Sequence, residues 1–264
     1  MLFLFSITWG LGIASKGQDL GWTSPLIMGL IFVAVVFLFI FFRLEHVLPH
    51  PMLDLSLFRS RLFTAATISA LLNYLCVFAG LFLVPFYLVQ GRGFAPSLAG
   101  LLITAQPVAM VISAPISGYL SDRIGSRLLS TGGMVILAAG MFTLHGLGAE
   151  SSAWQIVLPL ALTGLGTGLF VSPNNSAILG SAPRHRQGIT SGILATARNL
   201  GMVFGVAVSG AIFGMQMAQR SAGQAGSPTA FFGAFQDTFI VIAVIAIIGA
   251  ATSLVRGPAT PRTS

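Results

Sequence analysis

The sequence predicts an all-α protein that crosses a membrane several times, and three observations lead to this fold class. Hydrophobic residues make up 55% of the 264 residues, and charged residues make up only 7%. A soluble domain carries roughly 25% charged residues, so this chain has too few to cover a water-exposed surface. Its apolar runs, such as 25–42 and 239–254, are long and unbroken, whereas a membrane β-barrel would show alternating segments of about 10 residues.

Eight apolar stretches are candidates for membrane-spanning helices, because a helix needs ~20 apolar residues to cross the hydrocarbon layer. In chain order they cover residues 1–15, 25–43, 63–88, 97–120, 128–147, 154–176, 188–216 and 236–255. Pro25, Pro96 and the pair Ser151–Ser152 mark helix starts. The first stretch reaches Lys16 too soon for a full span and lacks the basic start of a signal peptide. We therefore expect the chain to begin partway into a helix.

The longest polar connection, RLEHVLPHPMLDLSLFRSR at 43–61, divides the chain. We expect four parts: a linking transmembrane hairpin at 1–43, a cytoplasmic linker at 44–62, a six-helix unit at 63–255 and a cytoplasmic tail at 256–264. A Gly- and Ser-rich loop is expected at 219–229, on the outside.

No enzymatic chemistry is visible in the sequence. His46 and His50 lie four residues apart beside Glu45, but Pro49 breaks the helix that would align them on a metal ion. The sequence contains no nucleotide-binding loop and no nucleophile–base pair, and Cys76 is its single cysteine. We expect no cofactor, no metal and no enzyme activity.

The basic residues of the loops predict the orientation through the positive-inside rule. With a cytoplasmic N-terminus, the outside loops carry Lys16, Arg92 and Arg220. The cytoplasmic segments then carry nine arginines, namely Arg43, Arg59, Arg61, Arg123, Arg127, Arg184, Arg186, Arg256 and Arg262. Both termini are cytoplasmic in this arrangement. Because the basic residues are scattered and not clustered on one face, nucleic acid is not an expected partner.

The stretch GYLSDRIGSR at 118–127 concentrates charge between two predicted helices. Gly118 permits close packing at the helix exit, and Gly125 permits a tight reversal with φ > 0. Asp122 is a negative charge that can accept hydrogen bonds from a neighbouring helix N-terminus. Arg123 and Arg127 can pair with Asp122 or with lipid phosphates. The alternative is a turn that serves only as a positive anchor.

Seven polar residues within the predicted spans are candidates for a transport path: Asn73, Tyr74, Gln106, Asn174, Asn175, Arg198 and Asn199. Each could equally form a polar contact between helices. Arg198 lies deep in its helix, where a charge costs several kcal/mol unless it is paired, and no predicted helix centre offers an acid. Four aromatic residues on one helix suit an apolar cavity for cationic drugs, or equally a lipid-facing surface: Phe78, Phe82, Phe86 and Tyr87.

Glycine and proline recur inside the predicted helices. Gly201 with Gly205, and Gly210 with Gly214, have the GxxxG spacing that allows two helix backbones to approach closely. The helix at 154–176 carries three further glycines, Gly164, Gly166 and Gly168. Pro107 and Pro115 are expected to bend the helix at 97–120. These features favour tight static packing, helices that slide during transport, or both.

An ordered set of segments resembles the major facilitator superfamily. GYLSDRIGSR is similar to the loop signature of that superfamily. Five other segments resemble its drug:H⁺ antiporter branch with fourteen transmembrane helices: GWTSPL at 21–26, EHVLPHPMLDLSLFRSR at 45–61, YLVQGRGFAPSLAGLL at 87–102, GLGTGLFVSPNNSAI at 164–178 and RQGITSGILATARNLG at 186–201.

The resemblance implies the C-terminal part of such a multidrug exporter, with residues 1–43 as the linking helix pair and 63–255 as the second half. It implies export of drugs or other lipophilic small molecules in exchange for protons across a bacterial inner membrane. The loop at 118–127 would be a gating latch against the other half, which would also supply the coupling acids. The alternatives are a non-transporting membrane fragment or a half-transporter that needs a partner half or a second copy.

Overall fold

The computed structural model describes residues 55–220 and 228–255. It also describes seven helical residues nearer the N-terminus, namely Gly29, Phe32, Val33, Val36, Phe39, Ile40 and Arg43. The chain divides into two units, Met1–Asp54 and Leu55–Ser264. The predicted hairpin at 1–43, most of the linker and the tail at 256–264 therefore lie largely or wholly outside the described residues.

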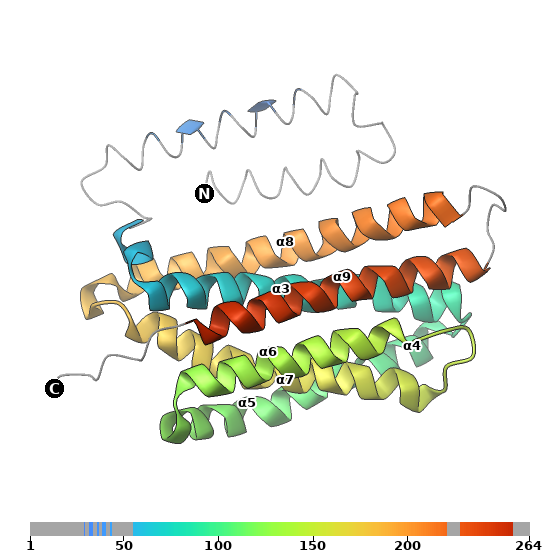
Figure 1. Ribbon diagram of the computed structural model, residues 1–264, viewed down its shortest axis with the longest axis horizontal. Coiled ribbons are helices and arrows are strands. Elements are labelled where there is room, and N and C mark those ends of the chain that lie inside the picture. Colours follow the sequence, from blue (N-terminus) through green and yellow to red (C-terminus); the bar gives the residue numbers. More distant parts are fainter. Residues whose placement is uncertain are drawn as a thin grey trace. The chain divides into compact units, whose positions relative to one another are not determined.

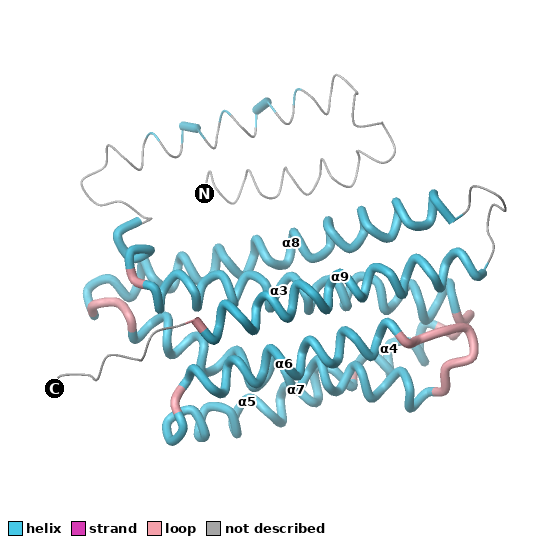
Figure 2. The backbone as a smooth tube through the Cα atoms, in the orientation of Figure 1, coloured by secondary structure: helices cyan, strands magenta, loops and turns pink. Residues whose placement is uncertain are grey.

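The described residues of the second unit form helices joined by short connections (Figures 1 and 2). The order is η1 (Leu55–Arg59), α3 (Arg61–Phe86), η2 (Tyr87–Gly91), α4 (Pro96–Ile103), α5 (Ala105–Ile124), α6 (Ser126–His145), α7 (Ala153–Gly180), η3 (Arg184–Arg186), α8 (Gln187–Arg220) and α9 (Pro228–Leu254). Six spans among these residues are long and apolar enough to cross a membrane, with α4 and α5 forming one span. The predicted all-helical, multi-span fold class is confirmed.

Two helix starts agree with the capping chemistry of the sequence. Pro96 is the first residue of α4, where a missing N–H costs nothing. Ser152 caps α7: its hydroxyl oxygen accepts from the Gln155 amide at 3.5 Å, and the Gln155 side-chain oxygen accepts from the Ser152 amide at 2.7 Å. This reciprocal pair satisfies two backbone donors that the helix leaves open.

The span predicted at 97–120 is two helices. α4 ends at Ile103 and α5 begins at Ala105, with Thr104 between them. Pro107 explains the break, because a proline ring collides with the carbonyl four residues earlier, here that of Ile103. Pro115 remains inside α5.

The predicted start of the last span, at residue 236, was wrong. α9 begins at Pro228, and α8 continues to Arg220, so the described residues leave only 221–227 between them. Proline suits the first turn of a helix, and the apolar run FFGAF follows it at 231–235. As a result Asp237 lies well inside α9 and not at its outer end, where the sequence had placed it.

Glycine spacing lets α7 pack closely on two neighbours. Gly164 and Gly168, one helical turn apart, face α5, while Gly166 faces α6. Residues two apart on a helix point about 200° from each other, at roughly 100° per residue. A side chain at Gly166 would place its Cβ 2.5 Å from the Leu137 amide nitrogen and 2.7 Å from the Gly133 carbonyl oxygen.

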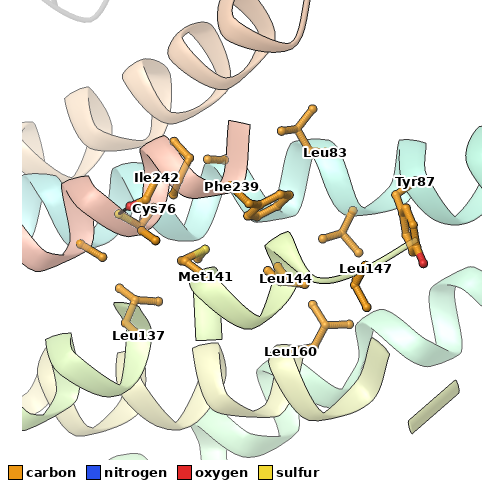
Figure 3. Close-up of a cluster of buried hydrophobic side chains, with 14 of the residues drawn as sticks. Cys76, Leu83, Tyr87, Leu137, Met141, Leu144, Leu147, Leu160, Phe239 and Ile242 are labelled. Atoms are coloured by element: carbon orange, nitrogen blue, oxygen red, sulfur yellow. Dashed lines mark hydrogen bonds between the residues drawn. The ribbon is translucent and has the colours of Figure 1, made fainter. Parts of the chain in front are cut away.

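The core of the unit lies among α3, α6, α7 and α9. Figure 3 shows part of this cluster: Cys76, Leu83, Tyr87, Leu137, Met141, Leu144, Leu147, Leu160, Phe239 and Ile242. Cys76 is fully buried, and its sulfur lies 3.6 Å from the Ile242 carbonyl oxygen. The two remaining spans are the least covered: 22% of the most apolar stretch of α4–α5 and 17% of that of α8 is buried, against 39–56% in the others.

Candidate transport surface

The most unusual charge in the spans is Arg198, which lies exposed on α8. Its guanidinium carbon is 6.0 Å from the centroid of the half-buried Tyr74 ring on α3. Tyr74 lies at the middle of α3 (Arg61–Phe86), so the guanidinium lies at about mid-depth of the bundle. Among the described residues, no acidic side chain forms an ion pair with Arg198. The cation–π contact with Tyr74 is therefore its electrostatic partner in this part of the chain.

Two glycines bring α8 against α3 beside this contact. A Cβ at Gly201 would collide with the Leu71 carbonyl oxygen and lie 2.9 Å from the Tyr74 Cβ. A Cβ at Gly205 would collide in the same way with the Leu75 carbonyl oxygen. Gly214 has the same GxxxG spacing from Gly210, but among the described residues no neighbouring helix comes within 4 Å of the position its Cβ would take.

Three phenylalanines continue from Tyr74 along the same face of α3, because residues four apart lie one above another on a helix. They are Phe78, Phe82 and Phe86. Phe78 and Phe82 are half-buried, and Phe86 is exposed. The rings of Phe82 and Phe86 are 5.1 Å apart between centroids, and the Cβ that Gly210 lacks would lie 3.4 Å from the Phe82 ring. We call Tyr74, Phe78, Phe82 and Phe86 the aromatic ladder.

Tyr87 is set apart from the ladder. Its side chain is fully buried and stacks on Phe235 with 4.7 Å between ring centroids. Its hydroxyl donates to the Gly148 carbonyl oxygen at 2.9 Å. These contacts tie the end of the α3 span to α9 and to the connection between α6 and α7.

The other polar candidates occupy different surroundings. Asn73 is fully buried and donates from its side-chain nitrogen to the Met134 sulfur of α6 at 3.4 Å. Asn174 is buried on α7. Gln106 and Asn175 are half-buried on α5 and α7, and Asn199 is half-buried beside Arg198. Of the seven candidates, Tyr74 and Arg198 contact each other.

The charged turn at 118–127 connects α5 and α6. Gly125 has φ +89°, which is the positive value expected for this reversal. The Arg123 guanidinium lies 4.5 Å from the Tyr119 ring centroid. Asp122 and Arg127 are exposed, and Asp122 forms no ion pair with any described residue. At Gly118, a Cβ would lie 3.4 Å from the Ser172 hydroxyl of α7.

The two ends of the six-span unit differ in charge. The end where α3 begins carries six described arginines and one acid: Arg59, Arg61, Arg123, Arg127, Arg184, Arg186 and Asp122. The opposite end carries two arginines and one acid, namely Arg92, Arg220 and Glu150, and Asp237 lies deeper in α9, paired with Arg220. Within the described residues, positive charge is thus concentrated at one end.

An ion pair that the sequence did not reveal joins α8 to α9. Arg220 and Asp237 form a charged hydrogen bond, with side chains 42% and 30% exposed. The guanidinium crosses Gly233, where a Cβ would collide with it. Gly233 and Asp237 are four residues apart and share a helix face. The four-residue spacing of Gly233 and Asp237 could have indicated this pair from the sequence. It does so only if both residues lie in one helix, which requires α9 to begin before Gly233.

This pair leads to a stability prediction. In a double-mutant cycle, Arg220→Gln and Asp237→Asn should show about 0.5–1 kcal/mol of coupling, because both side chains are partly exposed and water screens the pair. Gly233→Ala should reduce the coupling by displacing the guanidinium. The measurement is thermal unfolding in detergent, reported by reaction of the buried thiol of Cys76 with a fluorogenic reagent. Strictly additive effects of the two substitutions would contradict the pair.

Comparison with known proteins shows the family. The family model "Major Facilitator Superfamily" matches residues 2–206 and 66–264. The chain is 39% identical over 204 residues to "Uncharacterized transporter YebQ" of Escherichia coli, covering 77% of this chain and 45% of that protein. It is 33% identical to "Riboflavin transporter RibZ" of Clostridioides difficile (81% and 47% covered) and 31% identical to "Multidrug resistance protein Stp" of Mycobacterium tuberculosis (80% and 39% covered).

A solved structure described as "Structural insights into substrate recognition in proton dependent oligopeptide transporters" has a similar fold, with a TM-score of 0.65 and 20% identity over 76% of this chain and 42% of that chain. The chain spans about half the length of the curated relatives it matches. The helices, the family model and the relatives agree: this chain is a multi-pass membrane protein of the major facilitator superfamily, a family of transporters and not of enzymes.

Proposed function

We propose that the chain is part of an exporter that moves drugs or other lipophilic small molecules out of a bacterial cell in exchange for protons. The observation that carries this proposal is the exposed charge of Arg198 at mid-depth of the bundle. An arginine at the centre of a helix facing lipid costs about 2.5–3.5 kcal/mol on insertion scales. A face that exposes such a charge suits a water-accessible path better than hydrocarbon.

The relatives support the kind of cargo. One is named for multidrug resistance and another for riboflavin transport, so cargo with ring systems is compatible with this family branch. We propose that the other polar candidates, Gln106, Asn174, Asn175 and Asn199, border the same path, with Asn73 behind it.

A transport path needs protein on both sides, and the described helices supply one side. α5 and α8 leave most of their surface uncovered within the described unit, and we propose that a further six-helix half, or a second copy, covers these faces. The turn at 118–127 would act as a latch against that half, with Asp122 accepting hydrogen bonds from it. We place the arginine-rich end in the cytoplasm, because positive charge favours that side.

Proton exchange requires carboxylates that gain and lose protons in the path. Among the described carboxylates, Asp237 is paired with Arg220, while Asp122 and Glu150 lie at helix ends or in a turn. We propose that the coupling carboxylates come from the partner half.

Everted membrane vesicles test this function. The chain is produced alone, or together with the segment of E. coli YebQ that it does not match, and uptake of the dye Hoechst 33342 is followed under an imposed proton gradient. We expect gradient-dependent uptake only with both segments present, and its loss when an ionophore collapses the gradient. Uptake by the chain alone would contradict the need for a different partner half and would leave a second copy as the covering partner, whereas no uptake in either sample would contradict dye export.

A further inference from the structure

We infer that Arg198 and the aromatic ladder form a subsite for planar aromatic compounds that carry a negative charge. The inference deepens the proposed function and rests on it in one respect, namely that the exposed face of α8 borders a water-accessible path. It specifies cargo chemistry that the broad class of lipophilic small molecules leaves open.

The charged end of the subsite is the Arg198 guanidinium. A guanidinium presents five N–H donors in a planar fork that matches a carboxylate or sulfonate. The centroid of the Tyr74 ring lies 6.0 Å from the guanidinium carbon. This cation–π contact does not occupy the N–H donors of Arg198. The donors can therefore still form hydrogen bonds to an anion. No described acid pairs with Arg198, so the donors remain available to a ligand, and charge-assisted bonds of this kind are among the strongest in proteins.

The apolar end is the ladder itself. Tyr74, Phe78 and Phe82 lie on successive turns of α3 and are half-buried, so part of each side chain reaches the surface. Eight residues of helix rise about 12 Å, which is comparable with the long axis of a fused three-ring compound. Helices α3 and α8 run in the same direction, and Gly201, Gly205 and Gly210 follow the ladder along α8. The ladder therefore extends from Arg198 toward the outer end of the path.

Charge decides between anionic and cationic cargo. Aromatic rings alone attract cations, which is the basis of the expectation of a cationic-drug cavity. At this site, however, a full positive charge lies over the first ring of the ladder. The described acids lie elsewhere, Asp122 in the last turn of α5, Glu150 in a connection and Asp237 in its pair with Arg220. Among the described residues, a cation on the ladder would meet repulsion from Arg198 and no counter-charge.

Matched ligands test the subsite directly. The chain is purified into lipid nanodiscs, and Kd is measured by fluorescence for anthracene-9-carboxylate and for 9-(aminomethyl)anthracene, which share one ring system and differ in charge. We expect the anion to bind at least tenfold more tightly, since one charge-assisted contact is gained. Arg198→Gln should abolish the preference, and Arg198→Lys should keep part of it, because lysine retains charge but not the fork. Tyr74→Leu should weaken both ligands.

The control is Arg59→Gln, which removes an exposed arginine from η1 and should leave both Kd values unchanged. Slow labelling of Cys76 in each variant verifies that it is folded, since this thiol is fully buried. Equal affinity of the two ligands for the wild-type chain would overturn the inference, as would an Arg198→Gln variant that keeps the preference. Binding is measured without transport, so a preference for the anion alongside absent dye uptake would leave the subsite standing and refute only export of the dye.

Discussion

Gly133→Ala is expected to destabilise the six-span unit by about 2–3 kcal/mol, whereas Gly132→Ala, one residue earlier, should leave stability unchanged or raise it slightly. A Cβ at Gly133 would lie 2.7 Å from the Gly166 carbonyl oxygen and 2.8 Å from the Phe170 amide nitrogen. Both are backbone atoms of α7, so the whole helix must shift to accommodate one methyl group, and overpacking of this kind costs 1–3 kcal/mol or more. At Gly132 no neighbouring helix of the described residues comes within 4 Å of the added Cβ, and alanine favours the helix by up to about 1 kcal/mol.

The pair of variants isolates packing from helix propensity, since both make the same chemical change on the same helix. Cys76 serves as the reporter because it is the only cysteine of the chain and is fully buried. The temperature at which a thiol-reactive fluorophore labels half the protein should fall for Gly133→Ala and not for Gly132→Ala. Gly166→Ala, on the other side of the contact, should behave like Gly133→Ala. Equal midpoints for Gly132→Ala and Gly133→Ala would show that α6 and α7 are not in close contact at this point.

The six described spans could be predicted from the sequence because each is a long apolar run bounded by charge, proline or glycine. The stretch predicted at 128–147, for example, is α6 at Ser126–His145. The composition gave a wrong helix boundary before α9. The Gly- and Ser-rich run at 219–229 predicted a loop, but α9 already begins at Pro228. The error mattered, because it moved Asp237 to a helix end and hid its partner.

The candidate site was predictable only in part. A lone arginine in an apolar helix identifies Arg198, but its contact with Tyr74 depends on α3 and α8 lying side by side. Spacing could not separate the two GxxxG pairs either. Gly201 and Gly205 face the α3 backbone, whereas Gly214 faces no atom of the described chain. A spacing rule describes one helix surface, and whether that surface is covered depends on a second helix that the spacing does not specify.

Gly201→Ala is expected to change both stability and ligand selectivity. The added Cβ would collide with the Leu71 carbonyl oxygen and crowd the Tyr74 Cβ, so α8 must move away from α3 at the level of Arg198. We expect a loss of about 2 kcal/mol, since the obstacle is again backbone. The same movement withdraws the guanidinium from the first ring of the ladder, so the preference for anthracene-9-carboxylate over its amine analogue should shrink several-fold.

Gly214→Ala is the matched control, because it makes the same change on the same helix at a position where no described neighbour comes within 4 Å of the added Cβ. It should keep both the Cys76 labelling midpoint and the ligand preference of the wild-type chain. If Gly201→Ala lowered the midpoint but kept the full preference for the anion, close packing of α8 on α3 would be needed for folding alone, and the position of Arg198 would not depend on it. If it lowered both, the glycine that lets two helices touch would also be the residue that places the charge in the path.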